Sequence, residues 1–449
     1  MANVIKLRKG LDINLKGKAQ EKLVEVKWNG NFALLPDSFA GVTPKVVVKE
    51  GDTVKAGDPL FVNKHYLEVK FSAPVSGTVE TIVRGERRKV LAVKIKAGKE
   101  QEYADFGRQD VSKIDSDAVI GKLLDAGLFG YINQLPYAVS ANPSQKPKAI
   151  FVSALRDKPL SADFEFELKD NEKDFQTGLT ALSKIAKTYL GIGINQSSMA
   201  LTNAKDVDIN VFDGPCPAGN VGVQVNHLSP VNKGEVVWTV DPMVAVFFGR
   251  LFNTGHVDLT RAVAVVGSMV KNPQYVKAVI GASVADILSD NVCNDKKPRI
   301  IGGNVLTGKQ ITMNDFLGAD ASEITIIPEG DDADEMFGWI MPRINQFSKN
   351  RSYFSWLFGK KEYDADCRVK GGERRMIMSG EYDSVLPMDI YGEYLIKAIL
   401  AGDIDRMEQL GIYEVAPEDF ALAEFIDSSK LELQKIVREG LDMLRKENA

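Results

Sequence analysis

The sequence predicts a multidomain α/β protein built from four modules. The chain has 449 residues, whereas one compact domain usually holds about 100–200 residues. Residues 41–95 consist of short β-branched runs separated by glycines, and residues 148–240 alternate strand-like and helix-like patterns. Hydrophobic residues make up 44% and charged residues 26% of the chain, which is typical of globular proteins.

The first module, residues 1–102, is expected to be a small antiparallel β domain. Residues 1–17 alternate apolar and polar side chains without the apolar core of a signal peptide, which predicts a first strand. GDTVKAGDPLF (51–61) and APVSGTV (73–79) resemble the hammerhead of biotinyl and lipoyl carrier domains. Lys64 lies near the predicted hairpin tip but lacks the flanking residues of either modification motif. We therefore expect a biotinyl/lipoyl-like barrel-sandwich domain with an unmodified lysine.

The second module, residues 103–256, is expected to be a Rossmann-like α/β domain. Strands alternating with helices are typical of a parallel sheet. TGLTALSKIAKTYLG (177–191) predicts an amphipathic helix with Tyr189 on its apolar stripe. The predicted strands are KAIFVSAL (148–155), DINVF (208–212) and EVVWTV (235–240).

The third module, residues 257–330, predicts a β-grasp domain of the SLBB-like type, because short strands surround one small helix. Its apolar runs are RAVAVVGSMV (261–270), AVIGASVADIL (278–288), PRIIGGNVLTGKQI (298–311) and ITIIPEG (324–330).

The fourth module, residues 331–449, combines an aromatic insert with a C-terminal helical domain. Helices are expected at 388–401, at 417–425, and at 429–446 with a capping box from Ser429 to Glu432. The insert at 337–361 predicts either a surface for a membrane or a partner protein, or a hairpin packed on its own domain. Its aromatic residues are Phe337, Trp339, Phe347, Tyr353, Phe354, Trp356 and Phe358.

Composition excludes several classes of protein. Lys and Arg number 56 and Asp and Glu 61, so no basic surplus points to nucleic acid. Cys216, Cys293 and Cys367 form no CxxC pair, which argues against zinc and iron–sulfur sites and predicts free thiols. The three histidines are isolated in the sequence, so we predict no metal site and no catalytic residue. No window reaches the roughly 18–20 apolar residues of a membrane span.

Two glycine-bearing segments are candidates for ligand loops. FDGPCPAGNVGVQVNHL (212–228) follows a predicted strand, where an α/β sheet often binds a ligand. Its two prolines remove N–H donors, which favours a rigid loop at an interdomain contact instead. In GLFGYINQLPYA (127–138), Leu128, Phe129 and Tyr131 would crowd the space that a flavin phosphate needs.

The order of these segments, with IIGGNVLTG (300–308), IPEG (327–330) and MDIYGEYLIKAILAGDIDRMEQLG (388–411), resembles the NqrA family of Na⁺-translocating NADH:quinone oxidoreductases over essentially the whole chain. The RnfC proteins of the Rnf complex and the flavin-binding subunit of complex I are more distant relatives. Those relatives bind FMN through a GRGGAGFPTG-type loop and hold iron–sulfur clusters on grouped cysteines. In this chain, the segment at the position of that loop reads GLFGYINQLPYA (127–138). The C-terminal tail, which includes EFIDSSK (424–430), contains no cysteine.

The resemblance implies a peripheral subunit on the cytoplasmic face of the inner membrane. Its partners would be the other subunits, B to F, of a translocase that couples NADH oxidation and quinone reduction to Na⁺ export. FMN, FAD and Fe–S centres would lie on other subunits, while this chain would bind no redox cofactor and be inactive alone. The alternative is a flavin-binding electron-transfer subunit of the Rnf type.

A quinone is the one ligand expected for this chain itself, either ubiquinone or menaquinone. FALLPDSFAG (32–41) and GLFGYINQLPYA combine apolar walls with a few hydrogen-bond donors, as a quinone headgroup requires. The alternative for both segments is ordinary core and loop packing. The candidate contacts are Phe32, Leu34, Leu35, Phe39, Phe129, Tyr131 and Tyr137.

Overall fold

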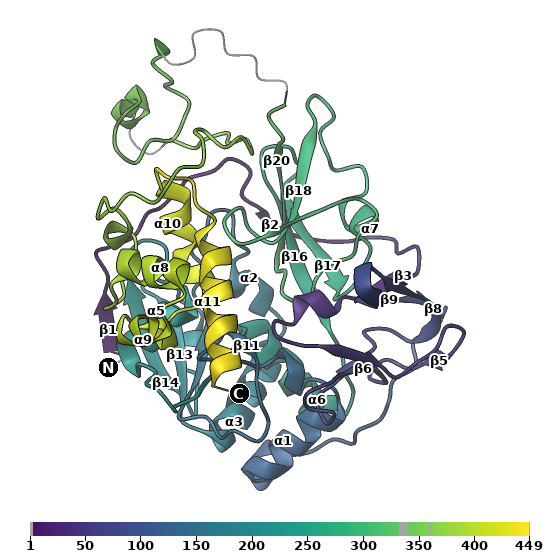
Figure 1. Cartoon of the computed structure of the whole chain (residues 1–449). Coiled ribbons are helices and arrows are strands. Elements are labelled where there is room, and N and C mark those ends of the chain that lie inside the picture. Colours follow the sequence, from purple (N-terminus) through teal and green to yellow (C-terminus); the bar gives the residue numbers. More distant parts are fainter. Residues whose placement is uncertain (1–2, 332–339, 359–360, 449) are drawn as a thin grey trace.

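The computed structural model describes residues 3–331, 340–358 and 361–448, which form four β-sheets and a helical C-terminal layer (Figure 1). The sheets have seven, six, four and three strands. As the sequence predicts, the protein is a multidomain α/β protein.

The N-terminal β module is a sandwich of the four-stranded and the three-stranded sheets. Its core contains Leu60, Phe61, Phe71 and Val93, none of which has exposed surface. The rings of Phe61 and Phe71 stack with centroids 4.8 Å apart. The strands are β3 (Asn31–Leu34), β4 (Pro44–Val46), β5 (Thr53–Val54), β6 (Pro59–Asn63), β7 (Lys70–Ser72), β8 (Gly77–Arg84) and β9 (Val90–Ala97).

The first residues of the chain do not belong to this sandwich. Strand β1 (Asn3–Lys6) pairs with β14 (Asp208–Asp213) in the seven-stranded sheet. Strand β2 (Gln20–Glu25) pairs with β17 (Gln274–Val279) in the six-stranded sheet. The sandwich therefore begins after residue 25 and not at residue 1, because open edges of the other two sheets pair with the N-terminal segment.

The second module contains the seven-stranded sheet, in the order β1-β14-β13-β12-β15-β10-β11. The first five strands in this order are parallel, as predicted, whereas β10 and β11 are added by antiparallel pairing. Every residue of β12 and β15 is buried, as expected for parallel strands covered on both faces. The remaining strands are β10 (Asn133–Leu135), β11 (Val139–Ser140), β12 (Ile150–Ser153), β13 (Thr188–Gly193) and β15 (Val237–Val240).

Helices cover both faces of this sheet. Helices α3 and α6 pack together in the largest hydrophobic cluster, whereas α5 contributes to a cluster shared with the C-terminal helices (Figure 1). The helices are α1 (Ser116–Asp125), α2 (Phe164–Leu168), α3 (Glu172–Ile185), α4 (Met199–Thr202), α5 (Val221–Leu228) and α6 (Pro242–Thr254).

The helix predicted at 177–191 is wrong at both ends. Helix α3 begins five residues earlier, at Glu172, and stops at Ile185, and Tyr189 lies in β13. The Tyr189 ring stacks on Phe151 of the neighbouring strand at 4.9 Å. Thr188 and Tyr189 favour strands, and their backbone groups pair with β12, so sheet formation ends the helical pattern.

The β-grasp prediction is confirmed in its elements. Six strands in the order β19-β18-β20-β16-β17-β2 surround one short helix. They are β16 (Thr260–Val266), β17, β18 (Pro298–Gly302), β19 (Lys309–Ile311) and β20 (Glu323–Pro328), with β2 at one edge and helix α7 (Val284–Leu288) after β17.

The C-terminal module contains α8 (Gly392–Ala401), α9 (Ile404–Gln409), α10 (Ala421–Ile426) and α11 (Leu433–Glu447). Helix α8 ends at Ala401, as predicted, and Gly402 after it adopts the left-handed conformation (φ 68°). The capping box predicted at Ser429 is wrong, because the Ser429 hydroxyl donates to the Arg375 carbonyl oxygen at 3.2 Å. Asp427 accepts the nearby backbone N–H groups of Ser429 and Leu431, so α11 begins only at Leu433.

The aromatic insert is divided between packed and exposed residues. Phe347 contacts Tyr363 and Phe425, with ring centroids 5.5 and 5.9 Å apart. Trp356 and Phe358 are 45% and 59% exposed. Phe337 and Trp339 lie outside the described residues. In the part of the chain that the structure describes, no helix has the length and apolarity needed to cross a membrane.

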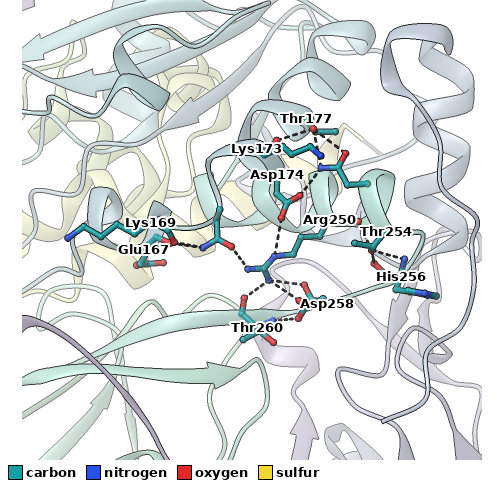
Figure 2. Close-up of polar contacts among 12 residues, drawn as sticks. Glu167, Lys169, Lys173, Asp174, Thr177, Arg250, Thr254, His256, Asp258 and Thr260 are labelled. Atoms are coloured by element: carbon teal, nitrogen blue, oxygen red, sulfur yellow. Dashed lines mark hydrogen bonds and ion pairs between the residues drawn. The ribbon is translucent and has the colours of Figure 1, made fainter.

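Arg250 of α6 joins the α/β module to the linker that enters the grasp sheet (Figure 2). Its guanidinium donates to the side-chain oxygen of Asn171 and to the carbonyl oxygen of Thr260, both at 2.6 Å. It also donates to the carbonyl oxygen of Asp258 at 3.3 Å. These bonds hold the start of α3 and the interdomain linker in one arrangement.

Candidate functional site

A cavity of about 530 Å³ lies where all four modules meet. The α/β sheet contributes the carboxyl ends of two adjacent parallel strands, with Arg156, Asp157 and Lys158 after β12 and Asp241 after β15. From β12 the chain proceeds through β13 and β14 to one side of the sheet, and β15 lies on the other side. Ligands of open α/β sheets bind at such a reversal of strand order.

The other modules complete the cavity wall. The sandwich contributes Phe39, and the segment before β10 contributes Tyr131. The grasp module contributes the turn at 302–304 and residues 319–323. The C-terminal module contributes residues 416–418 and Gln434. The cavity therefore exists only in the assembled chain.

Of the seven predicted contacts, only Phe39 and Tyr131 line this cavity. They are 6% and 7% exposed, and their rings meet edge to face with centroids 5.0 Å apart. They come from different modules, and the fold brings them together to form one aromatic part of the wall.

The other five predicted contacts lie elsewhere. Phe32, Leu34 and Phe129 are core residues, each at most 5% exposed, and Phe129 packs edge-on against Trp238. Leu35 and Tyr137 are half-buried and do not line the cavity. The packing alternative therefore describes these five residues better than a shared ligand site does.

Three polar atoms of cavity-lining residues are fully buried and have no hydrogen-bond partner among the described residues. They are the Tyr131 hydroxyl, Oδ1 of Asn220 and Oδ1 of Asp157. Burial raises the pKa of the Tyr131 hydroxyl far above its ordinary value, so this group is a neutral donor or acceptor. Burial also raises the pKa of the Asp157 carboxyl, while the Gly219 N–H and Lys158 oppose that rise.

Carboxylates outnumber cations around the cavity. Both cations are engaged by acidic partners: Arg156 by Glu167 and by Asp241 at 3.2 Å, and Lys158 by Glu418 at 2.7 Å. A phosphate would therefore meet paired cations and an excess of negative charge. The acidic lining residues are Asp157, Asp241, Asp320, Glu323 and Glu418.

The glycines of the 127–138 segment serve contacts with the sandwich. A Cβ on Gly127 would lie 2.0 Å from the Ser72 hydroxyl, and one on Gly130 would lie 2.3 Å from the Phe71 ring. Strand β7 therefore occupies the space that the missing side chains leave. These glycines permit close packing between modules.

The 214–220 loop makes interdomain contacts, as the favoured interpretation predicts, and also lines the cavity with Gly219 and Asn220. The Cys216 carbonyl oxygen accepts the Leu11 N–H at 2.7 Å. The Asn220 side-chain amide donates to Asp419 of the C-terminal module at 3.1 Å. One loop thus joins three parts of the chain.

Sequence reasoning missed Arg156, Asp157 and Lys158. Three consecutive charged residues directly after a buried parallel strand were the available signal, because such positions face the ligand edge of the sheet. The grasp turn at 302–304 carried no comparable signal.

The described residues contain no group of three or more His, Cys, Asp or Glu side chains arranged to hold a metal ion. The three cysteines are free, and the histidines lie apart. His227 and His256 each bond a backbone carbonyl through Nδ1, at 2.9 and 3.2 Å.

Fold and cavity define a multidomain α/β protein whose carrier-type β module, mostly parallel sheet, grasp module and helical layer enclose one shared site. Family models match three of these parts: the NqrA N-terminal barrel-sandwich hybrid domain over 5–98, the NqrA second alpha/beta domain over 114–257, and the NQRA C-terminal domain over 262–313.

Full-length relatives agree with these matches. The A subunit of the Na(+)-translocating NADH-quinone reductase of Haemophilus influenzae (strain PittGG) is 33% identical over 450 residues, covering 99% of this chain and 100% of that protein. The corresponding proteins of Vibrio alginolyticus and Pasteurella multocida (strain Pm70) are each 34% identical, with the same coverage. The chain belongs to the NqrA family, the A subunits of Na(+)-translocating NADH-quinone reductases.

Proposed function

We propose that this chain is a peripheral subunit, on the cytoplasmic face of the membrane, that supports the quinone-reduction step of a Na⁺-exporting NADH:quinone oxidoreductase. The observation that carries the proposal is the shared cavity, in which Phe39 and Tyr131 offer an aromatic wall and an unpartnered hydroxyl. A quinone headgroup is flat and apolar and presents two carbonyl acceptors, so it matches such a wall. The relatives' name supports the assignment to the complex.

The chain's own residues do not fit a flavin phosphate or an iron–sulfur cluster. A phosphate site needs open backbone N–H groups beside small residues, whereas Gly127 and Gly130 are covered by Ser72 and Phe71. The acidic excess in the cavity further disfavours a phosphate. The three cysteines are too few for a four-thiolate cluster. Electrons therefore pass through cofactors on other subunits, FMN, FAD and Fe–S among them.

The partners of this chain are the other subunits, B to F, of the same complex, and the chain alone is inactive as an NADH:quinone reductase. We regard the α/β module as Rossmann-like because of its strand order, β14-β13-β12-β15. The chain runs outward from β12 to β14 and then returns to place β15 on the other side of β12, as in doubly wound sheets. In this family member the ligand edge of that sheet serves a quinone in place of a dinucleotide.

Membranes from cells that lack this chain should lose Na⁺-dependent quinone reduction and retain NADH oxidation by artificial acceptors. Adding back the full chain should restore quinone reduction. Unchanged quinone reduction in its absence would contradict the proposal. A purified chain that absorbs in the visible with one flavin per chain would favour the Rnf-type alternative instead.

In the assembled complex, Tyr131→Phe should raise the KM for quinone about 3–10-fold, because one neutral hydrogen bond is lost. The NADH-oxidation rate with artificial acceptors should not change. Tyr137→Phe is the matched control, since it removes a hydroxyl outside the cavity that accepts a bond from Asn448 at 3.3 Å. Equal effects of the two variants, measured by steady-state kinetics, would argue against a quinone contact at Tyr131.

A further inference from the structure

The aromatic insert presents a group of apolar side chains to solvent. We call residues 340–358 the insert arm, and in Figure 1 this arm, drawn in green, projects beyond the sheets and the C-terminal helices. Its last residues form a short 3-10 helix, Phe354–Phe358. Exposed apolar side chains gathered in one segment are typical of an interaction surface. Seven large apolar side chains of the arm are between 42% and 62% exposed: Ile340, Met341, Ile344, Phe354, Trp356, Leu357 and Phe358.

Contacts with the C-terminal module hold the base of the arm. The Phe347 ring packs against Tyr363 and against Phe425 of α10, with centroids 5.5 and 5.9 Å apart. The side-chain amide of Asn350 donates to the Glu381 carboxylate at 3.0 Å. The exposed side chains of the arm are therefore presented from an attached base, and their positions relative to one another are set before any partner binds.

The arm is basic in an otherwise acidic protein. The whole chain has a net charge of −5, whereas residues 340–361 contain no Asp or Glu and five basic residues: Arg343, Lys349, Arg351, Lys360 and Lys361. Two of these cations lie beside exposed rings of the arm. The Arg351 guanidinium is 5.1 Å from the centroid of the Trp356 ring, and Lys361 Nζ is 5.7 Å from that of Phe358.

This pairing of cations with exposed aromatic rings fits an anionic lipid surface. Trp and Phe side chains settle at the boundary between lipid headgroups and acyl chains, while Lys and Arg bind the anionic headgroups. A protein partner fits less well, because the core of a protein–protein interface is depleted in lysine. We propose that the insert arm docks on an anionic lipid surface, with Trp356 and Phe358 entering the headgroup layer and Arg351 and Lys361 binding headgroups.

The inference deepens the proposed function, because it names the surface by which a peripheral chain meets the membrane. It rests on that peripheral placement and not on any ligand in the cavity. The arm would lie in the headgroup layer without crossing the bilayer. Vesicle binding and quinone reduction are therefore separate measurements, and either can fail while the other holds.

The test is flotation of the purified full-length chain with lipid vesicles. One set of vesicles contains phosphatidylcholine alone, and the other contains about one third phosphatidylglycerol, an anionic lipid. The chain should partition onto the anionic vesicles at least about tenfold more strongly, and raising the salt concentration should weaken this binding. This comparison needs no variant, so it stands even if a variant fails to fold.

The double variant Trp356→Ser, Phe358→Ser should lower partitioning onto anionic vesicles about tenfold or more, because two apolar rings no longer enter the headgroup layer. Tyr391→Ser, Tyr394→Ser is the matched control. These two aromatic residues on α8 are 68% and 59% exposed but lie outside the arm, so their removal should leave partitioning unchanged.

Arg351→Gln should weaken binding to anionic vesicles about 3–10-fold, since one cation near the charged surface is lost. Arg87→Gln is its matched control, because Arg87 is also exposed and also has a left-handed backbone, with φ 51° against 55° for Arg351. It lies in the turn between β8 and β9, so the same loss of charge there should have no effect on partitioning.

Each contrary outcome overturns the proposal. Binding to neither kind of vesicle, or equally to both, would exclude an anionic lipid surface. Equal effects of a variant and its control would show that the surface lies outside the arm. If the double variant floats like the parent chain but is no longer retained on membranes that hold the other subunits, the arm binds a protein partner instead. None of these results bears on quinone reduction, which the strain lacking the chain tests.

Discussion

Glu167→Gln is expected to lower the free energy of unfolding by about 3–5 kcal/mol, the usual loss when a buried ion pair is broken on one side. The Glu167 carboxylate has no exposed surface and bridges Arg156 and Arg261, whose side chains are 11% and 3% exposed. Arg156 follows β12 of the α/β module, and Arg261 lies on β16 of the grasp module. A neutral amide at position 167 would remove the carboxylate that both buried guanidinium groups contact.

Denaturant titration of the full chain measures this effect. Glu21→Gln is the control, because Glu21 pairs with Lys169 at the surface, where the side chains are 65% and 58% exposed. Water and salt screen such a pair, so the control should not change stability measurably. Equal results for the two variants would mean that the buried pair contributes nothing to the junction between modules.

Gly178→Ala is expected to destabilise the protein by about 3 kcal/mol, the upper part of the usual range for overpacking. Helices α3 and α6 cross with their backbones almost in contact. A Cβ on Gly178 would lie 1.8 Å from the Ala245 carbonyl oxygen, and one on Gly249 would lie 1.7 Å from that of Asp174. A backbone oxygen cannot rotate away, so the helices would have to separate.

Gly121→Ala is the matched control for this prediction. Gly121 is also helical, in α1, and a Cβ there would meet no atom within 4 Å. Alanine favours a helix over glycine, so this variant should stabilise the protein by about 0.5–1 kcal/mol. The thermal unfolding midpoint should fall in Gly178→Ala and rise in Gly121→Ala, each compared with the unsubstituted protein. A stabilising effect at both positions would contradict the close crossing.

The candidate site was only partly predictable. Phe39 and Tyr131, which line the cavity, were selected because aromatic or aliphatic walls beside a few hydrogen-bond donors suit a quinone headgroup. The same criterion also selected Phe32, Leu34 and Phe129, which pack in the core. The composition of a segment does not show which face of each residue remains open. That depends on modules distant in the sequence.

The capping and helix errors have a similar origin. Ser429 has the spacing of a capping box, but a carbonyl from residue 375 takes its hydroxyl. Tyr189 continues the helical stripe of α3, but β12 pairs with its backbone. In both cases the local sequence pattern indicated a helix feature, but a hydrogen bond to a residue distant in the sequence formed instead.

The sequence by itself determined the order and type of the modules, the parallel sheet and the free cysteines. These features follow from periodicity, glycine spacing and residue counts, which act over a few neighbouring positions. The tertiary structure alone decided where β1 and β2 pair, that Glu167 bridges two modules, and that residues from all four modules enclose one cavity. Pairing, ion bridging and enclosure depend on groups far apart in the chain, and only the folded backbone brings those groups within bonding distance.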